Sequence, residues 1–530
     1  MKEKILIIRF GSLGDIVLTS STVTNLKINY PQSHIVYLCK EKYRSVVELI
    51  DGVDEIVTLP DTASLMKYFK LLIELDKYNF DIIVDLHGNI RSWWGRKIIS
   101  ADKVVVYPKR RYERLMAVKN KVIPDSWPHT IDLYNEAVKK IKAKVYSKRP
   151  VLKIPEIIFD DPFNQFVKNN KVFIVVAPGA SYPTKQWPLE RFAEMAVNLH
   201  KSDKVGIIWA ITSIDEGKAS PEGNIDRSQF LKLVDSPLAN LTTVISQAAL
   251  TIANDSGVAH LSSSVGTPVM ALFGPTHPVL GFAPRGLHDR VMQVNESCRP
   301  CSLHGEKKCY RDKQYCFTRI RPEIVSNAAA EMLRSDINKN RAVFVDRDGT
   351  LIVDKHFLSN PDEIEFIPGT IEALKIIQQS DFKIVVISNQ SGVARGFFDI
   401  NTVEKVNARL VEMLVTHHIY VDAMYYCPHH PEGTVDEYAV ECNCRKPSAG
   451  MVEDAAFQLG INLQKSFVIG DKVDDINLGK VIGARAIMVK TGYGDKQKEE
   501  IEALDFYKET PIVEDLLEAV NYLKAVREND

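Results

Sequence analysis

The sequence predicts an α/β protein built of three units, each with a parallel sheet covered by helices. Short apolar runs of strand length alternate with helical patterns along the whole chain. This order is typical of parallel strands joined by crossover helices. Two stretches interrupt the alternation: residues 141–161, which contain two prolines, and the polar residues 335–340. We therefore expect units over about 1–160, 161–335 and 341–525.

The expected strands are short, apolar and rich in β-branched residues. In the first two units they are Ile5–Phe10, Ile35–Leu38, Ile82–Leu86, Val104–Val106, Val172–Ala177, Val205–Trp209, Leu250–Ala253 and Val269–Phe273. In the third unit they are Val343–Val345, Ile384–Ser388, Met424–Tyr426, Phe467–Ile469 and Ala486–Val489.

Composition excludes several classes of protein. The 530 residues include 67 Lys and Arg against 68 Asp and Glu, so no overall field favours nucleic acid. No apolar stretch approaches the roughly 18–20 residues that span a bilayer, and the apolar run after the first residues is too short for a signal peptide. We expect a cytoplasmic protein with at most peripheral membrane contact. The basic run Lys109–Arg111 with Arg114 is expected to be a solvated surface.

The third unit carries paired carboxylates directly after a predicted strand. Asp346 and Asp348 can both reach the crevice at the carboxyl edge of the sheet. One carboxylate can attack phosphorus, and the other can protonate the leaving oxygen and then activate water. Three further groups suit the same chemistry: the Ser388-Asn389 strand end for phosphate oxygens, Lys446 for the phosphoryl charge, and Asp471 for a magnesium ion.

These four motifs, in this order, resemble the haloacid-dehalogenase superfamily over nearly all of residues 341–495. The resemblance implies a Rossmann-like domain with Asp346 as nucleophile and Asp348 as acid and base. It further implies that Ser388 and Lys446 bind phosphate. Magnesium would be held by Asp346, the Asp348 carbonyl and Asp471.

The eight cysteines are grouped rather than scattered, which in an intracellular enzyme favours metal ligands over disulfides. Cys427, His429, Cys442 and Cys444 offer three thiolates and one imidazole, a set suited to a closed tetrahedral zinc site. This loop resembles the zinc loop of D-glycero-D-manno-heptose 1,7-bisphosphate phosphatases and bacterial histidinol-phosphate phosphatases. That resemblance selects His429 over His430, puts the loop in place of a cap domain, and implies that Arg445 contacts substrate.

The first two units contain several strand-to-helix junctions suited to anions. The first joins a strand to a helix through Gly11-Ser12-Leu13-Gly14-Asp15, where Asp15 can cap the helix or act as a base. The second unit contributes Lys185 after a strand and the segment Asp255-Ser256-Gly257…His260 at a helix start, a plausible diphosphate cradle.

Together with Asp85–Ser92, PGAS…TKQWP, NDSGVAHLSSSVGTP and FGPT, these segments resemble the lipopolysaccharide heptosyltransferases of glycosyltransferase family 9 over about residues 1–330. The resemblance implies a GT-B fold of two Rossmann-like domains and an inverting transfer that requires no metal. Asp15 would be the base, Lys185 would offset donor charge, and Asp255, Ser256, Gly257 and His260 would hold the diphosphate. The partners would be a nucleotide-sugar donor and a lipid-linked saccharide acceptor.

Two features depart from, or add to, this pattern. The acidic residue expected to contact the donor ribose has two candidates, Asp215 and Glu216, in an unfamiliar context. A second cluster, Cys298-x2-Cys301-x7-Cys309-x6-Cys316, suits zinc. An iron–sulfur cluster and a buried set of thiols are the alternatives.

The leading hypothesis is a bifunctional enzyme of heptose metabolism. Its third unit would remove the 7-phosphate of heptose 1,7-bisphosphate, a small sugar phosphate, and its first two would transfer heptose from a nucleotide diphosphate. One alternative is a histidinol-phosphate phosphatase fused to a transferase of other specificity. Another makes the first two units a nucleotide-sugar binding module without turnover.

Overall fold

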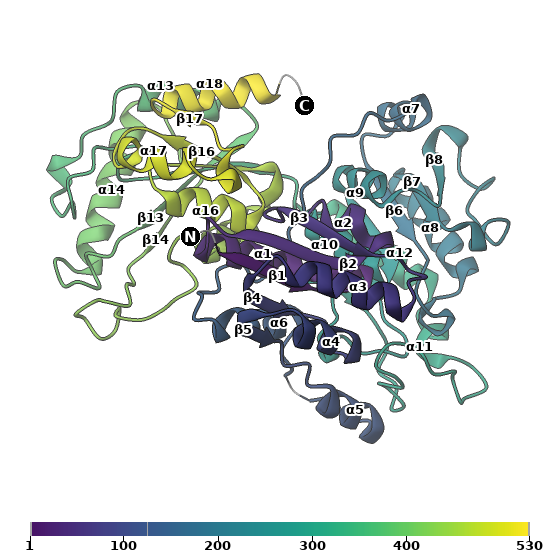
Figure 1. Cartoon of the computed structure of the whole chain (residues 1–530). Coiled ribbons are helices and arrows are strands. Elements are labelled where there is room, and N and C mark those ends of the chain that lie inside the picture. Colours follow the sequence, from purple (N-terminus) through teal and green to yellow (C-terminus); the bar gives the residue numbers. More distant parts are fainter. Residues whose placement is uncertain (1–2, 125, 528–530) are drawn as a thin grey trace. The chain divides into compact units, whose positions relative to one another are not determined.

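The computed structural model describes residues 3–124 and 126–527, and its contacts divide the chain into two compact units, Met1–Ser335 and Asp336–Asp530. All strand pairs within the three sheets of these units are parallel. Figure 1 shows each sheet with helices packed against it. Each compact unit is described by itself below.

The first sheet of the N-terminal unit has the strand order β3-β2-β1-β4-β5. Its strands are β1 (Lys4–Ile8), β2 (His34–Lys40), β3 (Glu55–Leu59), β4 (Phe80–Asp85) and β5 (Ala101–Val106). The helices that belong to it are α1 (Leu13–Asn29), α2 (Arg44–Val47), α3 (Leu65–Asp76), α4 (Ile90–Ile98), α5 (Arg111–Asn120) and α6 (Thr130–Lys140).

The second sheet has the order β11-β10-β9-β6-β7-β8. Its strands are β6 (Phe173–Ala177), β7 (Gly206–Ile211), β8 (Phe230–Val234), β9 (Leu250–Asn254), β10 (Val269–Leu272) and β11 (Arg290–Met292). Its helices are α7 (Asp161–Asn169), α8 (Leu189–Asp203), α9 (Leu238–Gln247), α10 (Gly257–Ser264), α11 (Tyr315–Thr318) and α12 (Pro322–Arg334).

One hydrophobic core runs through both sheets of this unit. It joins Ile5 of β1 and Val17 of α1 to Val175 of β6 and Leu261 of α10, all without exposed surface. Because the two sheets share this core, separating them would expose apolar surface to water, which is unfavourable. We retain the division near residue 160 into two domains as a proposal, since residues 141–160 form neither helix nor strand.

The C-terminal unit holds the third sheet, ordered β14-β13-β12-β15-β16-β17. Its strands are β12 (Arg341–Asp346), β13 (Phe382–Asn389), β14 (Ala423–Cys427), β15 (Phe467–Gly470), β16 (Arg485–Val489) and β17 (Ile512–Val513). Its helices are α13 (Thr370–Gln378), α14 (Ile400–Thr416), α15 (Gly450–Leu459), α16 (Val473–Ile482), α17 (Gly494–Glu502) and α18 (Leu516–Arg527).

Every strand expected from the sequence has a counterpart, with ends that differ by up to three residues. Four strands were not predicted: β3, β8, β11 and β17. Each lies at the edge of its sheet. An edge strand is only partly buried, so it lacks the continuous apolar run by which the central strands are recognised.

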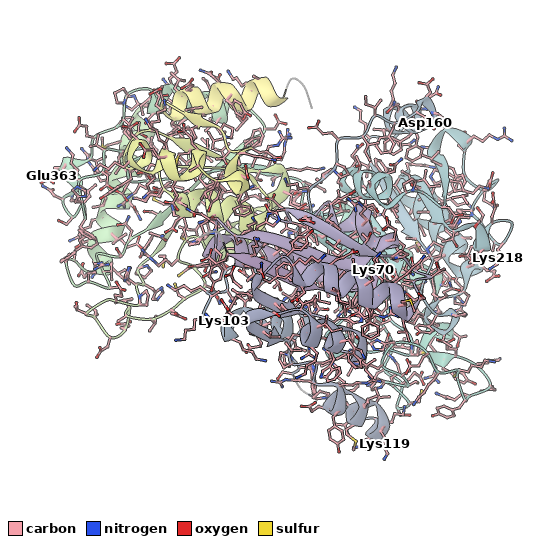
Figure 2. All side chains as sticks on the ribbon, viewed as in Figure 1. Lys70, Lys103, Lys119, Asp160, Lys218 and Glu363 are labelled. Carbon is pink, nitrogen blue, oxygen red and sulfur yellow. The ribbon has the colours of Figure 1, made fainter. Side chains whose placement is uncertain are left out.

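The basic run Lys109–Arg111 with Arg114 is only partly the solvated surface that the sequence predicts, since Arg110 and Arg111 are exposed but Lys109 and Arg114 are not. Arg114 is buried, with its guanidinium 4.7 Å from the centroid of the Phe282 ring. Lys109 is half-buried and donates to the His87 carbonyl. Other charged side chains, such as Lys119, Lys218 and Glu363, do lie at the periphery (Figure 2).

Within the described ranges, no helix is both long and apolar enough to cross a membrane.

Candidate active sites

The phosphatase site forms where three neighbouring strands of the third sheet end. Asp346 is the last residue of β12, Ser388 and Asn389 end β13, and Asp471 directly follows β15. Because β13, β12 and β15 are adjacent and parallel, their carboxyl ends meet at one edge of the sheet. The polar residues that the sequence places after separate strands are therefore brought together.

Lys446 lies at the centre of this cluster. Its Nζ is 2.6 Å from Asp346 Oδ1 and 2.6 Å from Asp475 Oδ1, and all three side chains are buried. Burial by itself would lower the pKa of Lys446, but the two carboxylates outweigh it and raise the pKa above the ordinary lysine value. Lys446 therefore carries a permanent positive charge beside the predicted nucleophile.

Three carboxylates converge here and could hold a metal ion. The carboxylate oxygens of Asp346, Asp471 and Asp475 lie within 4.8 Å of one another. Asp471 Oδ1 is buried and has no hydrogen-bond partner. Burial, and then the charge of Asp346, raise the pKa of Asp471 to about 8. A cluster of buried carboxylates with an unpaired oxygen fits a hard divalent cation such as Mg²⁺.

Asp475 also belongs to this site, although it is not among the predicted magnesium ligands. Its signal was its position four residues after Asp471, one turn into a helix that begins at the sheet edge. In the structure its carboxylate is buried and its pKa is raised to about 6 by burial. It takes part both in the ion pair with Lys446 and in the carboxylate cluster.

Asp348 lines the same cavity but has its own hydrogen-bond partners. It forms an ion pair with Arg347 at 2.9 Å, and Gln390 Nε2 donates to its Oδ2 at 2.7 Å. Ser388 Oγ also donates to Oδ2 at 3.2 Å. Burial by itself would raise the pKa of Asp348, but the Arg347 charge and these hydrogen bonds lower it. Gln390 was not among the predicted site residues, because its contact with Asp348 depends on the fold of the 388–392 loop.

Asn389 and Arg445 shape the loops around the pocket rather than touching the carboxylates. The Lys446 backbone N–H donates to Asn389 Oδ1 at 3.0 Å, and Asn389 Nδ2 donates to the Lys446 carbonyl at 3.2 Å. Arg445 donates from NH1 to the His429 carbonyl at 3.3 Å and also lines the pocket. Asn389 thus fixes the loop that delivers Lys446.

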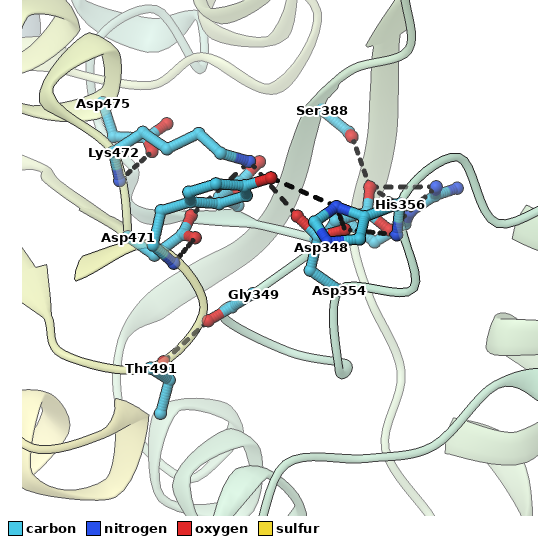
Figure 3. Close-up of polar contacts among 12 residues, drawn as sticks. Asp348, Gly349, Asp354, His356, Ser388, Asp471, Lys472, Asp475 and Thr491 are labelled. Atoms are coloured by element: carbon cyan, nitrogen blue, oxygen red, sulfur yellow. Dashed lines mark hydrogen bonds and ion pairs between the residues drawn. The ribbon is translucent and has the colours of Figure 1, made fainter. Parts of the chain in front are cut away.

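The cavity above these residues is about 250 Å³ and open on one side. Its outer wall includes His356 and Tyr493, whose Nδ1 and hydroxyl lie 3.1 Å apart. Figure 3 shows His356 beside Asp348 and Asp354, with Lys472, Asp471 and Asp475 in the same view. The Tyr493 backbone N–H donates to Asp471 Oδ2 at 2.8 Å. A hydrogen bond therefore connects Tyr493, at the rim of the cavity, with the carboxylate cluster.

The predicted zinc ligands lie together in the loop after β14. Cys427 Sγ lies 3.5 Å from Cys442 Sγ and 3.2 Å from Cys444 Sγ. His429 Nδ1 lies 3.3 Å from Cys444 Sγ, whereas His430 faces Arg395. Hydrogen bonds, that from Cys427 first, lower the pKa of Cys444 to about 5. Three sulfurs and one nitrogen at these separations fit a tetrahedral metal ion.

In the N-terminal unit, Asp15 is ionised and paired. Its carboxylate forms an ion pair with buried Arg9 and accepts from Ser12 Oγ at 2.9 Å. Tyr134 donates its hydroxyl to Oδ1 at 3.3 Å. Burial by itself would raise the pKa of Asp15, but the charge of Arg9 and the Ser12 hydrogen bonds outweigh it and lower the pKa to about 2.

The predicted donor residues cluster at the start of α10. Lys185 Nζ is 2.8 Å from Asp255 Oδ2, which also accepts from Thr276 Oγ1 at 2.7 Å. Ser256 Oγ and His260 Nδ1 are buried and have no hydrogen-bond partner. Buried polar atoms are rarely left unpaired. Two such atoms at a helix N-terminus fit an anionic ligand that supplies the missing partners.

Two glycines let α1 and α10 approach closely. A Cβ built on Gly14 would lie 2.5 Å from the His260 ring, and one on Gly257 would lie 2.7 Å from the Leu13 side chain. A larger residue at either position would push the helix starts apart. The approach brings the loop of Asp15 next to the predicted donor site within the N-terminal unit.

The potential ligand atoms of the second cysteine cluster lie farther apart than those of the first. All four cysteines, Cys298, Cys301, Cys309 and Cys316, line one small pocket with Thr184 and Gln314. Among the described residues, two groups place three or more potential ligand atoms within 4.8 Å of one another, and this cluster is not one of them. Asp215, a candidate for the ribose contact, pairs with Lys218 at 2.9 Å.

The folds and sites define the class of each unit: a phosphatase of the haloacid-dehalogenase type follows a two-sheet glycosyltransferase. Comparisons with known proteins agree. A family profile described as "Glycosyltransferase family 9 (heptosyltransferase)" matches residues 68–312, and one described as HAD-hydrolase-like matches residues 443–519.

Relatives of the C-terminal unit include the D-glycero-beta-D-manno-heptose-1,7-bisphosphate 7-phosphatases of Photorhabdus laumondii and Pasteurella multocida. They are 39% and 41% identical over 153 and 155 residues, which cover 81% and 83% of those proteins and 28% and 29% of this chain. A solved family 9 glycosyltransferase of Veillonella parvula is 22% identical with a TM-score of 0.50, covering 62% of this chain and 97% of that one. This last likeness shows the fold alone.

Through its C-terminal unit the chain belongs to the D-glycero-beta-D-manno-heptose-1,7-bisphosphate 7-phosphatase family, and it carries a family 9 glycosyltransferase domain ahead of it. The chain is therefore a fusion of a heptosyltransferase-like part and a heptose bisphosphate phosphatase-like part.

Proposed function

We propose that the C-terminal unit removes the 7-phosphate of heptose 1,7-bisphosphate. The observation that carries this proposal is the buried contact of Lys446 with both Asp346 and Asp475 at the sheet edge, in a unit about 40% identical to phosphatases named for that substrate. The site supplies a nucleophile, a fixed cation for the phosphoryl group and a carboxylate cluster for a metal.

In the proposed reaction, a carboxylate oxygen of Asp346 attacks phosphorus, and the bond from phosphorus to the sugar oxygen breaks. Asp348 gives its proton to that oxygen. Water then attacks the aspartyl-phosphate, Asp348 takes a proton from the water, and Asp346 is released with inorganic phosphate. The dianionic phosphate brought beside Asp348 favours its protonated form at the start.

Ser388, Asn389 and Lys446 are the proposed phosphate-binding residues, and Arg445 the proposed contact to the sugar end. The proposed magnesium ligands are Asp346, Asp471 and the Asp348 carbonyl. We add Asp475, because its carboxylate lies within 4.8 Å of those of Asp346 and Asp471. When bound, the magnesium ion would offset the charge of the phosphate oxygens. Cys427, His429, Cys442 and Cys444 would hold zinc and so fix the loop that carries Arg445.

A substrate panel tests the phosphatase proposal on the full chain. We expect phosphate release from heptose 1,7-bisphosphate to exceed release from histidinol phosphate and from heptose 7-phosphate. The substrate dependence is read as kcat/KM for inorganic phosphate formation. Equal or faster release from histidinol phosphate would assign the unit to that alternative substrate instead.

We further propose that the N-terminal unit transfers heptose from a nucleotide diphosphate to a lipid-linked saccharide on the cytoplasmic side. Lys185, Asp255, Ser256, Gly257 and His260 would bind the donor diphosphate, which supplies partners for the unpaired Ser256 and His260 atoms. Asp15 would take the proton of the acceptor hydroxyl. Its pairing with Arg9 keeps it in the ionised form, the form that a general base requires.

An Asp15→Asn variant separates catalysis from mere binding. We expect transfer to fall by roughly 10²–10⁴-fold, the usual contribution of a positioned general base, while donor affinity measured by calorimetry is unchanged. Unchanged transfer would remove Asp15 from the mechanism. Absence of transfer by the unaltered chain, with the donor bound, would favour a binding module.

We also propose that Cys298, Cys301, Cys309 and Cys316 bind a metal, although their sulfur atoms lie farther apart than the ligand atoms of the first cluster. Elemental analysis of the purified chain decides it. Two equivalents of a thiophilic metal per chain would support both cysteine sites, and one equivalent would show that the two sites do not both bind metal.

A further inference from the structure

Helix α3 carries more apolar side chains than the fold buries. Tyr68, Leu72 and Leu75 of α3 are buried in the core beside β1 and β4. Along one flank of this buried stripe, α3 exposes Leu65, Met66 and Ile73 by 72, 81 and 58%. A contiguous apolar patch that stays exposed is typical of a contact surface.

Helix α4 extends the same exposed surface. Ile90, Trp93 and Trp94 are 78, 40 and 42% exposed, and their spacing of three and four residues puts them on one side of the helix. The Trp94 ring packs against Phe69 of α3 with centroids 5.5 Å apart, and against Trp93 at 4.9 Å. The two helices therefore present one continuous apolar surface, which we call the α3–α4 face. It comprises Leu65, Met66, Phe69, Ile73, Ile90, Trp93 and Trp94.

The face is rigidly supported from below. Tyr68 donates its hydroxyl to the Arg91 carbonyl at 2.5 Å. The Cα of Gly95 lies so close to the core that an added Cβ would meet Ile8 at 3.3 Å. The exposed side chains are therefore a fixed feature of the two packed helices.

Basic residues outnumber acidic ones on these two helices. The basic residues are Lys67, Lys70, Arg91, Arg96 and Lys97, and the acidic ones are Glu74 and Asp76 in the last turn of α3. Lys67, Lys70 and Lys97 are exposed, and Figure 2 shows Lys70 on α3. The Lys97 ammonium lies 5.9 Å from the centroid of the Trp93 ring.

We propose that the α3–α4 face docks on the surface of an anionic lipid bilayer. Tryptophan at a boundary between apolar and polar surroundings, aliphatic side chains and flanking lysines are the combination that binds the lipid headgroup region. Anionic headgroups complement the lysines. A symmetric contact with a second copy would instead bring these cations against each other, so the charge pattern disfavours self-association through this face.

The position of the face suits the lipid-linked acceptor, and this point rests on the proposed transferase. Helix α4 begins four residues after Leu86, whose carbonyl accepts from Arg9 NH1 at 2.6 Å. Arg9 is the partner of Asp15. An acceptor anchored in a bilayer beneath α3 and α4 would hold its saccharide on the side of the unit where Asp15 lies.

Vesicle sedimentation of the full chain tests the proposal. We expect binding to vesicles of phosphatidylethanolamine and phosphatidylglycerol, weak binding to phosphatidylcholine, and a loss of binding at high salt. Met66→Glu/Ile90→Glu should abolish binding. Lys67→Gln/Lys70→Gln/Lys97→Gln should weaken it on the order of 100-fold, from about fivefold per cation.

Matched controls lie elsewhere on the same unit. Ile214→Glu changes a residue that is 79% exposed, and Lys168→Gln/Lys171→Gln/Lys201→Gln removes three exposed lysines. Both should bind vesicles like the unaltered chain, and all variants should keep its circular dichroism spectrum and thermal unfolding, which shows that the N-terminal unit folds. The proposal is overturned if Met66→Glu/Ile90→Glu binds vesicles normally. It is equally overturned if the unaltered chain ignores vesicles but self-associates in a way that this variant abolishes.

A spectroscopic readout locates the contact on the face itself. Fluorescence of the five tryptophans should shift to the blue when anionic vesicles are added, as Trp93 and Trp94 leave water. Trp93→Phe/Trp94→Phe should lose the shift while retaining most of the binding. A shift that persists in this variant would place the contact on another surface.

Discussion

The phosphatase site and the donor site both handle negative charge, but they are prepared for it in opposite ways. In the phosphatase site the cation is already neutralised, because Lys446 contacts Asp346 and Asp475 at 2.6 Å. In the donor site one ion pair, Lys185 with Asp255, stands beside two buried polar atoms without partners, on Ser256 and His260. In the phosphatase site the buried lysine is already paired with carboxylates, which outnumber it. In the donor site two buried polar atoms can still form hydrogen bonds with a ligand.

The difference bears on what each site needs in order to work. An excess of buried carboxylate is stabilised by a compensating cation, so we expect the phosphatase site to bind a metal before it accepts an anionic substrate. For the donor site we expect the diphosphate itself to supply the partners of the open groups.

The largest expected effect comes from Asp346→Asn. Removing a covalent nucleophile should lower phosphate release on the order of 10⁴-fold or more, while transferase activity of the same preparation is retained. Phosphate release is measured with heptose 1,7-bisphosphate. Asp362→Asn, at an exposed position of the same unit, should leave release unchanged. Substantial activity in Asp346→Asn would assign the nucleophile elsewhere.

Lys446→Gln breaks the internal pairing of the phosphatase site. It leaves Asp346 and Asp475 buried without their cation, which should destabilise the C-terminal unit by about 3–5 kcal/mol in the absence of metal. Chemical denaturation monitors unfolding. The double variant Lys446→Gln/Asp475→Asn should recover part of the loss, because one of the facing charges is gone. A double variant that is less stable than the single one would contradict the charge argument.

The zinc loop gives an intermediate effect and a close control. His429→Gln should remove one equivalent of tightly bound metal and weaken its affinity by more than about 100-fold, the upper range seen when only an outer partner of a ligand is lost. His430→Gln changes the neighbouring histidine, which faces Arg395, and should retain the metal. Elemental analysis with a competing chelator distinguishes the two. Equal metal content in both variants would show that His429 is not a ligand.

The smallest expected effect is at the donor site. Ser256→Ala should reduce donor affinity by roughly 5- to 10-fold, within the net value of a typical hydrogen bond, with little change in stability because Ser256 Oγ has no hydrogen-bond partner within the protein. Ser262→Ala, further along α10, removes a hydroxyl that donates to the Thr267 carbonyl at 2.9 Å. It should show the reverse pattern, reduced stability with unchanged affinity. Calorimetry and thermal unfolding measure the two quantities.

Much of both sites was accessible from the sequence, for a local reason. Asp346, Ser388 and Asp471 each follow a short apolar run, and in a parallel sheet the ends of such runs are where polar groups gather. The cysteine and histidine spacing of the zinc loop is likewise local, and the structure brings together the four ligands that it predicts. Edge strands such as β3 and β17 escaped prediction, since their partial burial leaves no continuous apolar signal.

The sequence by itself thus determined the three parallel sheets, the carboxylates at the end of β12 and the cysteine and histidine cluster that begins at the end of β14. Only the tertiary structure decided that Gln390 and Arg347 hold Asp348, and that Asp475 joins Lys446. It also decided that Arg114 is buried while Arg110, Arg111 and the α3–α4 face are exposed. The physical reason is the same in each case: strand and ligand signals lie within a few residues, whereas burial and charge pairing depend on segments that meet only after the sheets have formed.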